Sequence, residues 1–572
     1  MSDAGKEAAG FRKIIAKLGN LAWLALAKRG LVVSLPPFAS SGGPRMFGRV
    51  KPLDAILATA EKKSLHRTLG WFQLTLFGIG SVIGTGIFVL TAAGAQKAGP
   101  GLMLAFLIAG AVCIVAALCY AEIASMIPVA GSAYTYSYAT MGETIAWTVG
   151  WALIMEYAIA AAAVSVGWSG YFTGTILNQF MGIHLPAWLS AGPLALGGAA
   201  GGLINLPALV IALLVTWLLI VGTSESAKVN AVLVLIKVTA LTVFIALTVT
   251  SPSFDAAKFN PFLPAGVFGG FGTGVGAVGA AATIFFAYVG FDSVSTAAEE
   301  TKNPQRNVPI GLIGSLLFCT AFYILVAAGA IGTLGGQPIM GPGGVPFPAG
   351  SEELARQCAL PQYSQQLVCS GEALAHVLRM IGFSTIGNML GVAAFLALPS
   401  VILVLLFGQT RIFFVMSRDG LLPEALSRVH PRYKTPHIVT AITGSVVALG
   451  AAFFPVGQLA DISNAGTLYA FMMVALAVLL LRKRDPGRKR HFRVPAVWLV
   501  APLTMVGCVF LFFNLPSQAM LFLPLWGALG LGIYFAYGRS RSHLGRGIVE
   551  VHEPEYADLE PDIPGIEDRG RP

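Results

Sequence analysis

Four glycines lie within nine positions of the first hydrophobic run, in the segment Gly78-Ile79-Gly80-Ser81-Val82-Ile83-Gly84-Thr85-Gly86-Ile87-Phe88. Because glycine has no Cβ, this segment permits close backbone approach and local unwinding of a helix. Unwinding exposes backbone N–H groups, which can bind a carboxylate. Close helix packing of the small-xxx-small type is the alternative; it explains Gly80 and Gly84 but does not require Gly86.

A second interruption lies deep in the sixth hydrophobic run, where glycine and an acidic residue occur together in Phe285-Phe286-Ala287-Tyr288-Val289-Gly290-Phe291-Asp292. Two interrupted helices at corresponding positions of two five-helix halves are typical of inverted-repeat transporters, in which the unwound backbone lines a cavity. Free N–H groups there can hold a carboxylate, and free carbonyl groups can hold an ammonium. One such site suits a zwitterion and favours an amino acid as the ligand.

Ionisable residues are few within the hydrophobic runs. Lys237 lies about 12 Å into the fifth run, at 1.5 Å per residue. Placing a lysine there costs on the order of 3 kcal/mol, so a functional role such as proton exchange is the default hypothesis. The alternative is a side chain that extends to the cytoplasmic face. Glu156 and Asp292 are also deep, and each can be a substrate ligand or a helix-packing partner, the latter being favoured for Glu156.

Motifs for other chemistries are missing from the sequence. The eight histidines lie in loops, tails or helix ends, which argues against an intramembrane haem or metal site. The six cysteines form no CxxC pair, and there is no P-loop, kinase or hydrolase motif. We therefore expect neither enzymatic activity nor a cofactor, and no ATP-driven transport.

The composition predicts the elements that position these residues. Of the 572 residues, 55% are hydrophobic and 11% are charged, and the mean hydropathy is +0.74. Soluble domains carry about 25% charged residues, so this chain is predicted to be an all-α integral membrane protein. Twelve runs are long enough to cross a bilayer. Their approximate spans are 70–94, 101–126, 142–178, 205–223, 229–250, 272–298, 309–333, 385–411, 436–454, 462–482, 494–514 and 517–538. The third is long enough to predict a tilted helix that continues beyond the membrane.

Basic residues predict the orientation. The 37 basic and 27 acidic residues give a net charge of +10, which fits either nucleic acid or an anionic membrane surface. If the N-terminus is cytoplasmic, only four basic residues fall on or near the outer side, namely Lys97, Lys258, Arg356 and Arg379. The positive-inside rule then places both termini in the cytoplasm, and nucleic acid is not needed as a partner.

The chain is thus divided into a basic cytoplasmic tail (1–68), a transmembrane transporter domain (69–538) and a second cytoplasmic tail (539–572). Residues 11–17 of the first tail are amphipathic and either lie on the inner leaflet or stay solvated, whereas residues 551–572 have a composition typical of disorder. The long outer loop (334–384) contains Cys358 and Cys369, eleven positions apart on the oxidising side. A disulfide and two free thiols both remain open there.

The sequence resembles the amino acid–polyamine–organocation superfamily, and especially its bacterial cationic amino acid transporter family. The resemblance covers about residues 62–538 and depends on several motifs that occur in order. These are Gly78–Phe88, Gly131–Tyr136 with Gly142-Glu143, Glu225-Ser226 with Asn230, Phe286–Asp292, Glu300–Pro309, Gly408–Arg411 and Met416–Pro423. The first sixty residues have no counterpart in the family, the loop 334–384 is longer than usual, and Pro399 departs from the usual residue types of the eighth helix.

The resemblance implies ten core helices in two inverted repeats, with discontinuous first and sixth helices, plus two further helices. It implies alternating access, with substrate between the first and sixth helices. The substrate segments are then Val82 to Gly86, in which Ile83 is flanked by carboxylate-binding Gly84, Thr85 and Gly86, and Phe286 to Asp292. The carbonyl groups of Val82, Phe286, Ala287 and Val289 would bind the α-ammonium, with Phe286 as a candidate gate. Lys237 matches a lysine of proton-coupled relatives, and Glu143 a carboxylate needed near the inner end of the pathway.

These features predict a proton-coupled importer of amino acids, cationic or broad in range, in the inner membrane of a bacterium. The alternatives are an uncoupled exchanger or facilitator and an amino-acid-binding membrane sensor. A channel would need rings of pore-lining polar residues, which the sequence lacks. An accessory subunit is not specified by the sequence.

Overall fold

The structure is a computed structural model that describes residues 50, 69–127, 132–193, 202–222, 227–296, 301–433 and 435–547. The tail 1–68 with its amphipathic stretch, except Val50, and the end of the C-terminal tail lie outside these ranges, as do Gly131, Glu225, Ser226 and Glu300 of the family motifs. The side chain of Asn230 is likewise outside the described set.

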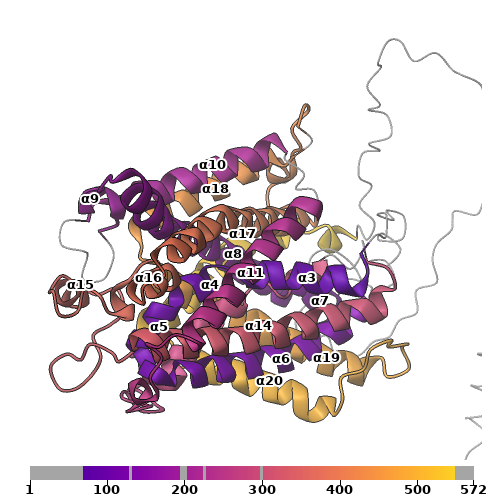
Figure 1. Ribbon diagram of the computed structural model, residues 1–572. Coiled ribbons are helices and arrows are strands. Elements are labelled where there is room, and N and C mark those ends of the chain that lie inside the picture. The colour runs from indigo at the N-terminus through magenta and orange to yellow at the C-terminus, as the bar shows by residue number, and fades with distance from the viewer. Residues whose placement is uncertain are drawn as a thin grey trace, which may run out of the picture. The chain divides into compact units, whose positions relative to one another are not determined.

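The described residues are overwhelmingly helical, which confirms the predicted all-α class (Figure 1). A two-residue strand, β1 (Ile204–Asn205), pairs with Ser190 and Ala191. The helices of the first half are α3 (Trp71–Val82), α4 (Thr85–Phe88), α5 (Leu90–Ala98), α6 (Leu102–Met126), α7 (Ser132–Thr140), α8 (Glu143–Tyr171), α9 (Ala187–Ser190), α10 (Leu206–Val221) and α11 (Ala227–Val249). Those that follow are α12 (Gly276–Ile284), α13 (Ser293–Thr296), α14 (Pro304–Leu334), α15 (Glu352–Cys358), α16 (Ala373–Met380), α17 (Ser384–Arg418), α18 (His437–Phe453), α19 (Val456–Arg484), α20 (Val497–Phe512), α21 (Ser517–Ile533) and α22 (Arg539–Arg541).

Helix covers each of the twelve predicted hydrophobic runs. In the described part of the chain, eight helical segments are long and apolar enough to cross a membrane, and four shorter apolar helices accompany them. The four shorter ones are α3, α10, α18 and α20. Helix α8 continues into a π-helical segment (Phe172–Met181), which gives a joined helix of 39 residues. This length agrees with the prediction that the third helix is longer than a bilayer requires.

Both predicted interruptions are present. Helix α3 ends at Val82, and α4 begins at Thr85 after the extended residues Ile83 and Gly84. Helix α12 ends at Ile284 and passes through a 3₁₀ turn, η4 (Phe285–Tyr288), before α13. Gly290, which lies between η4 and α13, has a φ of +108°, a conformation that L-residues with a Cβ rarely adopt. Gly84 and Gly290 therefore lie where the helical hydrogen-bond ladder stops, whereas Gly78 and Gly80 lie within α3.

The interrupted helices are surrounded by continuous ones. Helix α8 packs against α17 and α19, while α14 packs against α3 and α6 (Figure 1). The contact surfaces are built from small residues: a Cβ on Gly110 would meet Thr320 at 2.8 Å, and a Cβ on Gly150 would meet Met416 at 2.7 Å. Such close approach is how helices associate where lipid removes the hydrophobic driving force.

The outer loop is held to α5 and to the π-helical segment that continues α8. The side chain of Gln96 donates to the carbonyl oxygens of Ile339 and Phe347 and accepts from the Ile339 N–H, each at 3.0 Å. Glu372 pairs with Arg379 and accepts from the Thr175 hydroxyl at 2.6 Å. Burial raises the pKa of the Glu372 carboxyl, although the neighbouring Arg379 acts in the opposite direction.

Cys358 and Cys369 form a disulfide in this loop. The sequence left this pair open as a disulfide or as two free thiols. Of the two, the structure contains the disulfide, which links the end of α15 to the 3₁₀ turn η6 (Leu367–Cys369). The other four cysteines are free and buried.

A buried ion pair lies at the far end of α5. Lys97, which the orientation argument counted among the residues on or near the outer side, is 7% exposed and pairs with Asp461 of α19 at 3.2 Å. Thr283 of α12 accepts from Lys97 at 2.5 Å and donates to the other Asp461 oxygen at 2.6 Å. This triad ties both interrupted helices to α19, and hydropathy alone gives no signal for it.

Candidate functional site

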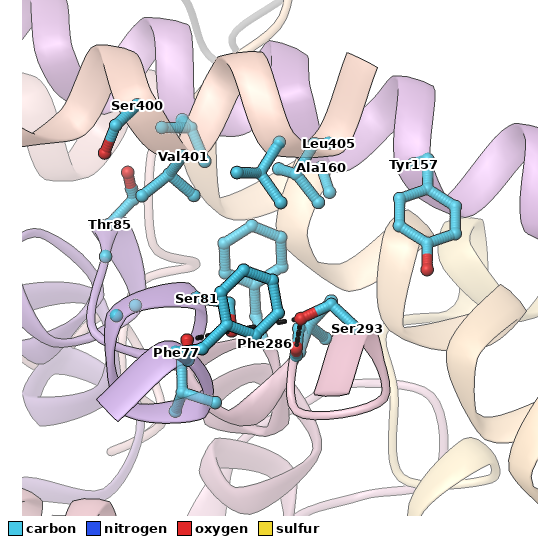
Figure 2. Close-up of a pocket in the computed structure, with 18 residues that line it drawn as sticks. Phe77, Ser81, Thr85, Tyr157, Ala160, Phe286, Ser293, Ser400, Val401 and Leu405 are labelled. Carbon is cyan, nitrogen blue, oxygen red and sulfur yellow. Dashed lines mark hydrogen bonds between the residues drawn. The ribbon is translucent and has the colours of Figure 1, made fainter. Parts of the chain in front are cut away.

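A cavity lies between the two helix breaks (Figure 2). Residues of α3, α4, η4 and α13 form one side, and residues of α8 and α17 form the other. The lining residues are Phe77, Gly80, Ser81, Val82, Gly84, Thr85, Gly86, Tyr157, Ala160, Val164, Phe286, Val289, Gly290, Ser293, Ser400, Val401, Val404 and Leu405. No lining residue carries a formal charge at neutral pH, so the wall is apolar with a few hydroxyl groups and exposed backbone.

The break in the first helix presents unused hydrogen-bond donors. In the described part of the chain, the backbone N–H groups of Gly84, Thr85 and Gly86 have no partner, as expected for the first residues of a helix. The Thr85 hydroxyl is also without a partner, although the residue is only 1% exposed. A buried polar group without a partner is costly, so these donors together suit a ligand with acceptor oxygens.

The second break approaches the first very closely. A Cβ on Gly86 would lie 2.2 Å from Ala287 Cα, and a Cβ on Gly290 would lie 2.8 Å from the Ser81 carbonyl oxygen. The Ser293 hydroxyl lies 3.0 Å from the Ser81 hydroxyl and 2.5 Å from the Gly290 carbonyl oxygen, within hydrogen-bond distance of both (Figure 2). Gly86 and Gly290 are therefore required by the space between the two segments.

Tyr323 of α14 bridges the two breaks from behind. Its hydroxyl lies 3.0 Å from the carbonyl oxygens of both Val82 and Ala287. Because a phenol has one proton, it can donate to only one of them at a time. Two carbonyl groups for which the sequence predicted ammonium binding thus share a protein donor, and the residue that supplies it was not identified from the sequence.

We expect Tyr323→Phe to destabilise this region, since the change keeps the ring packing against Phe106 and Tyr288 but removes the shared donor. Loss of a buried hydrogen bond costs about 1–3 kcal/mol, so the melting temperature should fall and substrate uptake should slow. Tyr363→Phe is the matched control, because within the described residues the Tyr363 hydroxyl makes no hydrogen bond. Equal melting temperatures for the two variants would show that the bridge has no energetic importance.

Lys237 reaches the first break from α11. Its Nζ donates to the Gly80 carbonyl oxygen at 3.0 Å, and the residue is 2% exposed. The side chain therefore points into the protein. Gly80 lines the cavity and Lys237 does not, so the ammonium group contacts the site only through the Gly80 carbonyl.

The deep carboxylates lie behind the cavity wall. Asp292 is 2% exposed and accepts from the Tyr157 hydroxyl at 3.0 Å, and it is Tyr157 that lines the cavity. Glu156 is 1% exposed and does not line the cavity, and its backbone carbonyl accepts from the Ser463 hydroxyl. Its Oε2 has no hydrogen-bond partner among the described residues. The structure thus places neither carboxylate in contact with the cavity.

The remaining predicted residues divide into two groups. Phe286 and Val289 line the cavity, whereas Ile83 and Ala287 are buried behind it. Glu143, the first residue of α8, is not in the cavity lining. It accepts from Tyr534 at 2.9 Å and Ser542 at 2.5 Å, and from Tyr138 at 3.3 Å.

Residues of α8 and α17 were not predicted to form the site. Val401 and Leu405 are four positions apart and therefore lie on one face of α17, opposite Phe286 (Figure 2). Ala160 and Val164 repeat this spacing on α8. Both pairs are ordinary apolar residues within hydrophobic helices, so their sequence carries no signal that separates a cavity wall from a lipid-facing surface.

Comparison with known proteins assigns the fold and the site to a family. The family model described as amino acid permease matches residues 69–528. The chain belongs to the amino acid permease family. This confirms the resemblance inferred from the motifs, and the match spans both helix breaks and the walls of the cavity.

Several members of the amino acid permease family are similar over most of their length. A branched-chain amino acid permease of Bacillus subtilis is 43% identical over 501 residues, which cover 88% of this chain and 99% of the relative. A methylthioribose transporter of the same organism is 40% identical over 87% of this chain and 99% of the relative. A chloroplastic cationic amino acid transporter of Arabidopsis thaliana is 36% identical over 78% of this chain and 72% of the relative. All three are named as permeases or transporters rather than enzymes, in agreement with the sequence.

Proposed function

We propose that this permease takes up neutral amino acids with aliphatic side chains across the cell membrane in symport with protons. The observation that carries this proposal is the uncharged cavity between two helix breaks, with free backbone donors at one end. The sequence left cationic substrates open. The cavity favours neutral ones, because none of its lining residues could neutralise a cationic side chain.

The two ends of an amino acid suit different parts of the cavity. The α-carboxylate would accept from the N–H groups of Gly84, Thr85 and Gly86 and from the Thr85 hydroxyl. The α-ammonium would bind backbone carbonyl groups of Val82, Phe286, Ala287 and Val289. The Tyr323 hydroxyl can donate to either the Val82 or the Ala287 carbonyl, and the Phe286 carbonyl accepts from the Val289 N–H at 3.2 Å, so the Val289 carbonyl is the better candidate.

The substrate side chain would lie against α8 and α17. Ala160, Val164, Val401 and Leu405 form an apolar wall there, and the ring of Phe286 faces it across the cavity. A branched aliphatic chain would bury apolar surface at about 25 cal/mol per Å², whereas a lysine or arginine side chain would lose hydration without a partner. The similarity to a branched-chain amino acid permease supports this assignment.

Phe286 would close over the substrate as the occluding gate.

Proton coupling would act through Lys237. The ammonium group holds the Gly80 carbonyl of the first break, so its loss of a proton would weaken that contact and change the conformational preference of α3. No cofactor is required; the coupling ion is H⁺. Glu143 would act at the inner end of the pathway through its contacts with the segment that follows α21.

For the complete membrane domain we propose twelve crossings, 69–538, with α3–α5 and α12–α13 as the discontinuous helices of two inverted repeats. Both termini would be cytoplasmic and the membrane would be a bacterial inner membrane. The eight long and four shorter apolar helices provide enough segments for this count, and the clustering of basic residues after α19 supports the orientation.

The purified protein should be stabilised against heat by leucine, isoleucine or valine, and not by lysine or arginine. Each bound ligand raises stability by RT ln(1 + [L]/Kd), which is about 2.7 kcal/mol at one hundred times Kd. Stabilisation by the cationic amino acids alone would overturn the proposed substrate class. Counterflow of labelled leucine in proteoliposomes distinguishes a carrier, which exchanges label, from a sensor, which binds leucine without moving it.

A further inference from the structure

A second hollow lies outside the transport cavity, on the surface of the helical bundle. It is an open groove between the first three turns of α14 and the loop that joins α19 to α20. The α14 side contributes Arg306, Ile310, Ile313, Gly314 and Leu317, and the loop contributes His491 and Phe492. This groove is unrelated to the proposed substrate site and needs a separate explanation.

The α14 wall has a polar end and an apolar end. Positions 306, 310, 313 and 317 follow the helical period and lie on one face, which passes from a guanidinium to exposed aliphatic side chains. Ile310 is 38% exposed and Leu317 is 54% exposed. Within the described residues, the Arg306 guanidinium forms no hydrogen bond or ion pair, and no acidic residue lines the groove. The charge is therefore available to an anion.

Other residues of the motif Glu300–Pro309, which contains Arg306, stabilise the turn before α14. The Asn307 side chain donates to the Lys302 carbonyl, and the Lys302 N–H donates to the Leu69 carbonyl at 2.8 Å. These contacts of Lys302 and Asn307 fix the local conformation. The exposed side chains of Gln305 and Arg306 take no part in these contacts.

The opposite wall is preformed by a buried ion-pair network. Glu122 of α6 accepts two hydrogen bonds from Arg482, each at 2.7 Å, and one from the Val494 N–H at 2.8 Å. Arg490 lies 3.3 Å from the same carboxylate and donates to the Leu481 and Asp485 carbonyl groups. His491 and Phe492 are thus presented by a loop anchored on both sides, and this loop belongs to the most basic segment of the chain, 482–493.

We propose that this groove binds one anionic phospholipid from the leaflet on the side of the 482–493 segment. The phosphate would contact Arg306 and His491, and an acyl chain would lie along Ile310, Ile313 and Leu317. The combination of a basic end with a continuous apolar wall matches a lipid better than a free phosphate, which would use the basic end alone. Basic pockets between transmembrane helices on the cytoplasmic side of a membrane are suited to anionic lipid headgroups.

Native mass spectrometry of the full chain with added phosphatidylglycerol or phosphatidylcholine tests this site. The wild type should retain phosphatidylglycerol preferentially, and Arg306→Gln should weaken retention roughly fivefold, the effect of one basic residue near a charged headgroup. Arg539→Gln is the matched control, because Arg539 is exposed and is not part of the groove. Equal retention by the two variants, or equal retention of the two lipids by the wild type, would refute the site.

A second variant tests the acyl-chain half independently. A Cβ on Gly314 would meet Thr75 at 3.4 Å, an ordinary contact, so Gly314→Ala should fold and narrow the groove. Its melting temperature without lipid should equal that of the wild type, and its retention of phosphatidylglycerol should fall several-fold. Competition by soluble glycerol phosphate at the same concentration would instead identify a simple phosphate site and overturn the lipid assignment.

Discussion

Lys237→Ala is expected to abolish the response of amino acid uptake to an imposed pH gradient, reducing gradient-driven accumulation at least tenfold. The residue is 2% exposed, and its ammonium group donates to the Gly80 carbonyl oxygen at 3.0 Å, one turn before the break in the first helix. Alanine has no group that can bind or release a proton there. Uptake into proteoliposomes, with the outside made acidic, measures the effect.

Two further variants separate proton exchange from a structural role of Lys237. Lys237→Arg keeps a cation and donors for Gly80 but cannot lose its proton in a protein, so it should retain substrate binding while losing the gradient response. Lys489→Ala removes an exposed lysine and should leave the response intact. Gradient-driven accumulation by Lys237→Ala equal to that of the wild type would contradict proton coupling through this residue and favour an exchanger or facilitator.

Gly86→Ala is expected to eliminate transport by forcing the two helix breaks apart. The added Cβ would lie 2.2 Å from Ala287 Cα, 2.5 Å from Ala287 Cβ and 2.9 Å from the Ala287 backbone nitrogen. Two of these atoms are backbone and the third, Cβ, is fixed to it, so none can move aside as a flexible side chain can. Overpacking of a well-packed interior costs about 1–3 kcal/mol and sometimes more, and here the strain falls directly on the proposed carboxylate site. Leucine uptake and the leucine-induced thermal shift should both be lost.

Gly527→Ala is the matched control for this substitution. It also places a methyl group on a glycine within a hydrophobic helix, α21, but no atom lies within 4 Å of the added Cβ. Its uptake should equal that of the wild type. If Gly86→Ala folds and transports at the wild-type rate, the close contact between the two breaks does not exist in the functional protein.

The positions of the breaks could be predicted because they depend on local properties. Helix α3 ends at Val82, within the glycine-rich segment, and α12 ends at Ile284, directly before the segment in which a glycine and an acidic residue occur together. The same holds for Lys237, since the cost of placing a charge in an apolar run can be read from the sequence. Its partner could not be, because Gly80 is 157 positions away.

Asp292 shows the limit of such reasoning most clearly. Its depth in an apolar run made it a candidate substrate ligand. In the structure Tyr157 lines the cavity instead, and its hydroxyl donates to the Asp292 carboxylate at 3.0 Å. The change of direction at Gly290 determines which way the following residues point. A shift of this turn by one residue would change which side chains face the cavity and which face the protein interior.

By itself the sequence determined that the chain is a helical membrane protein and where two of its helices break, because hydropathy and helix-interrupting residues act over a few turns. Only the tertiary structure decided that Val401 and Leu405 oppose Phe286, that Tyr323 joins Val82 to Ala287, and that Lys97 pairs with Asp461. Those contacts join residues far apart along the chain, and apolar helices of similar composition do not specify which of their faces meet.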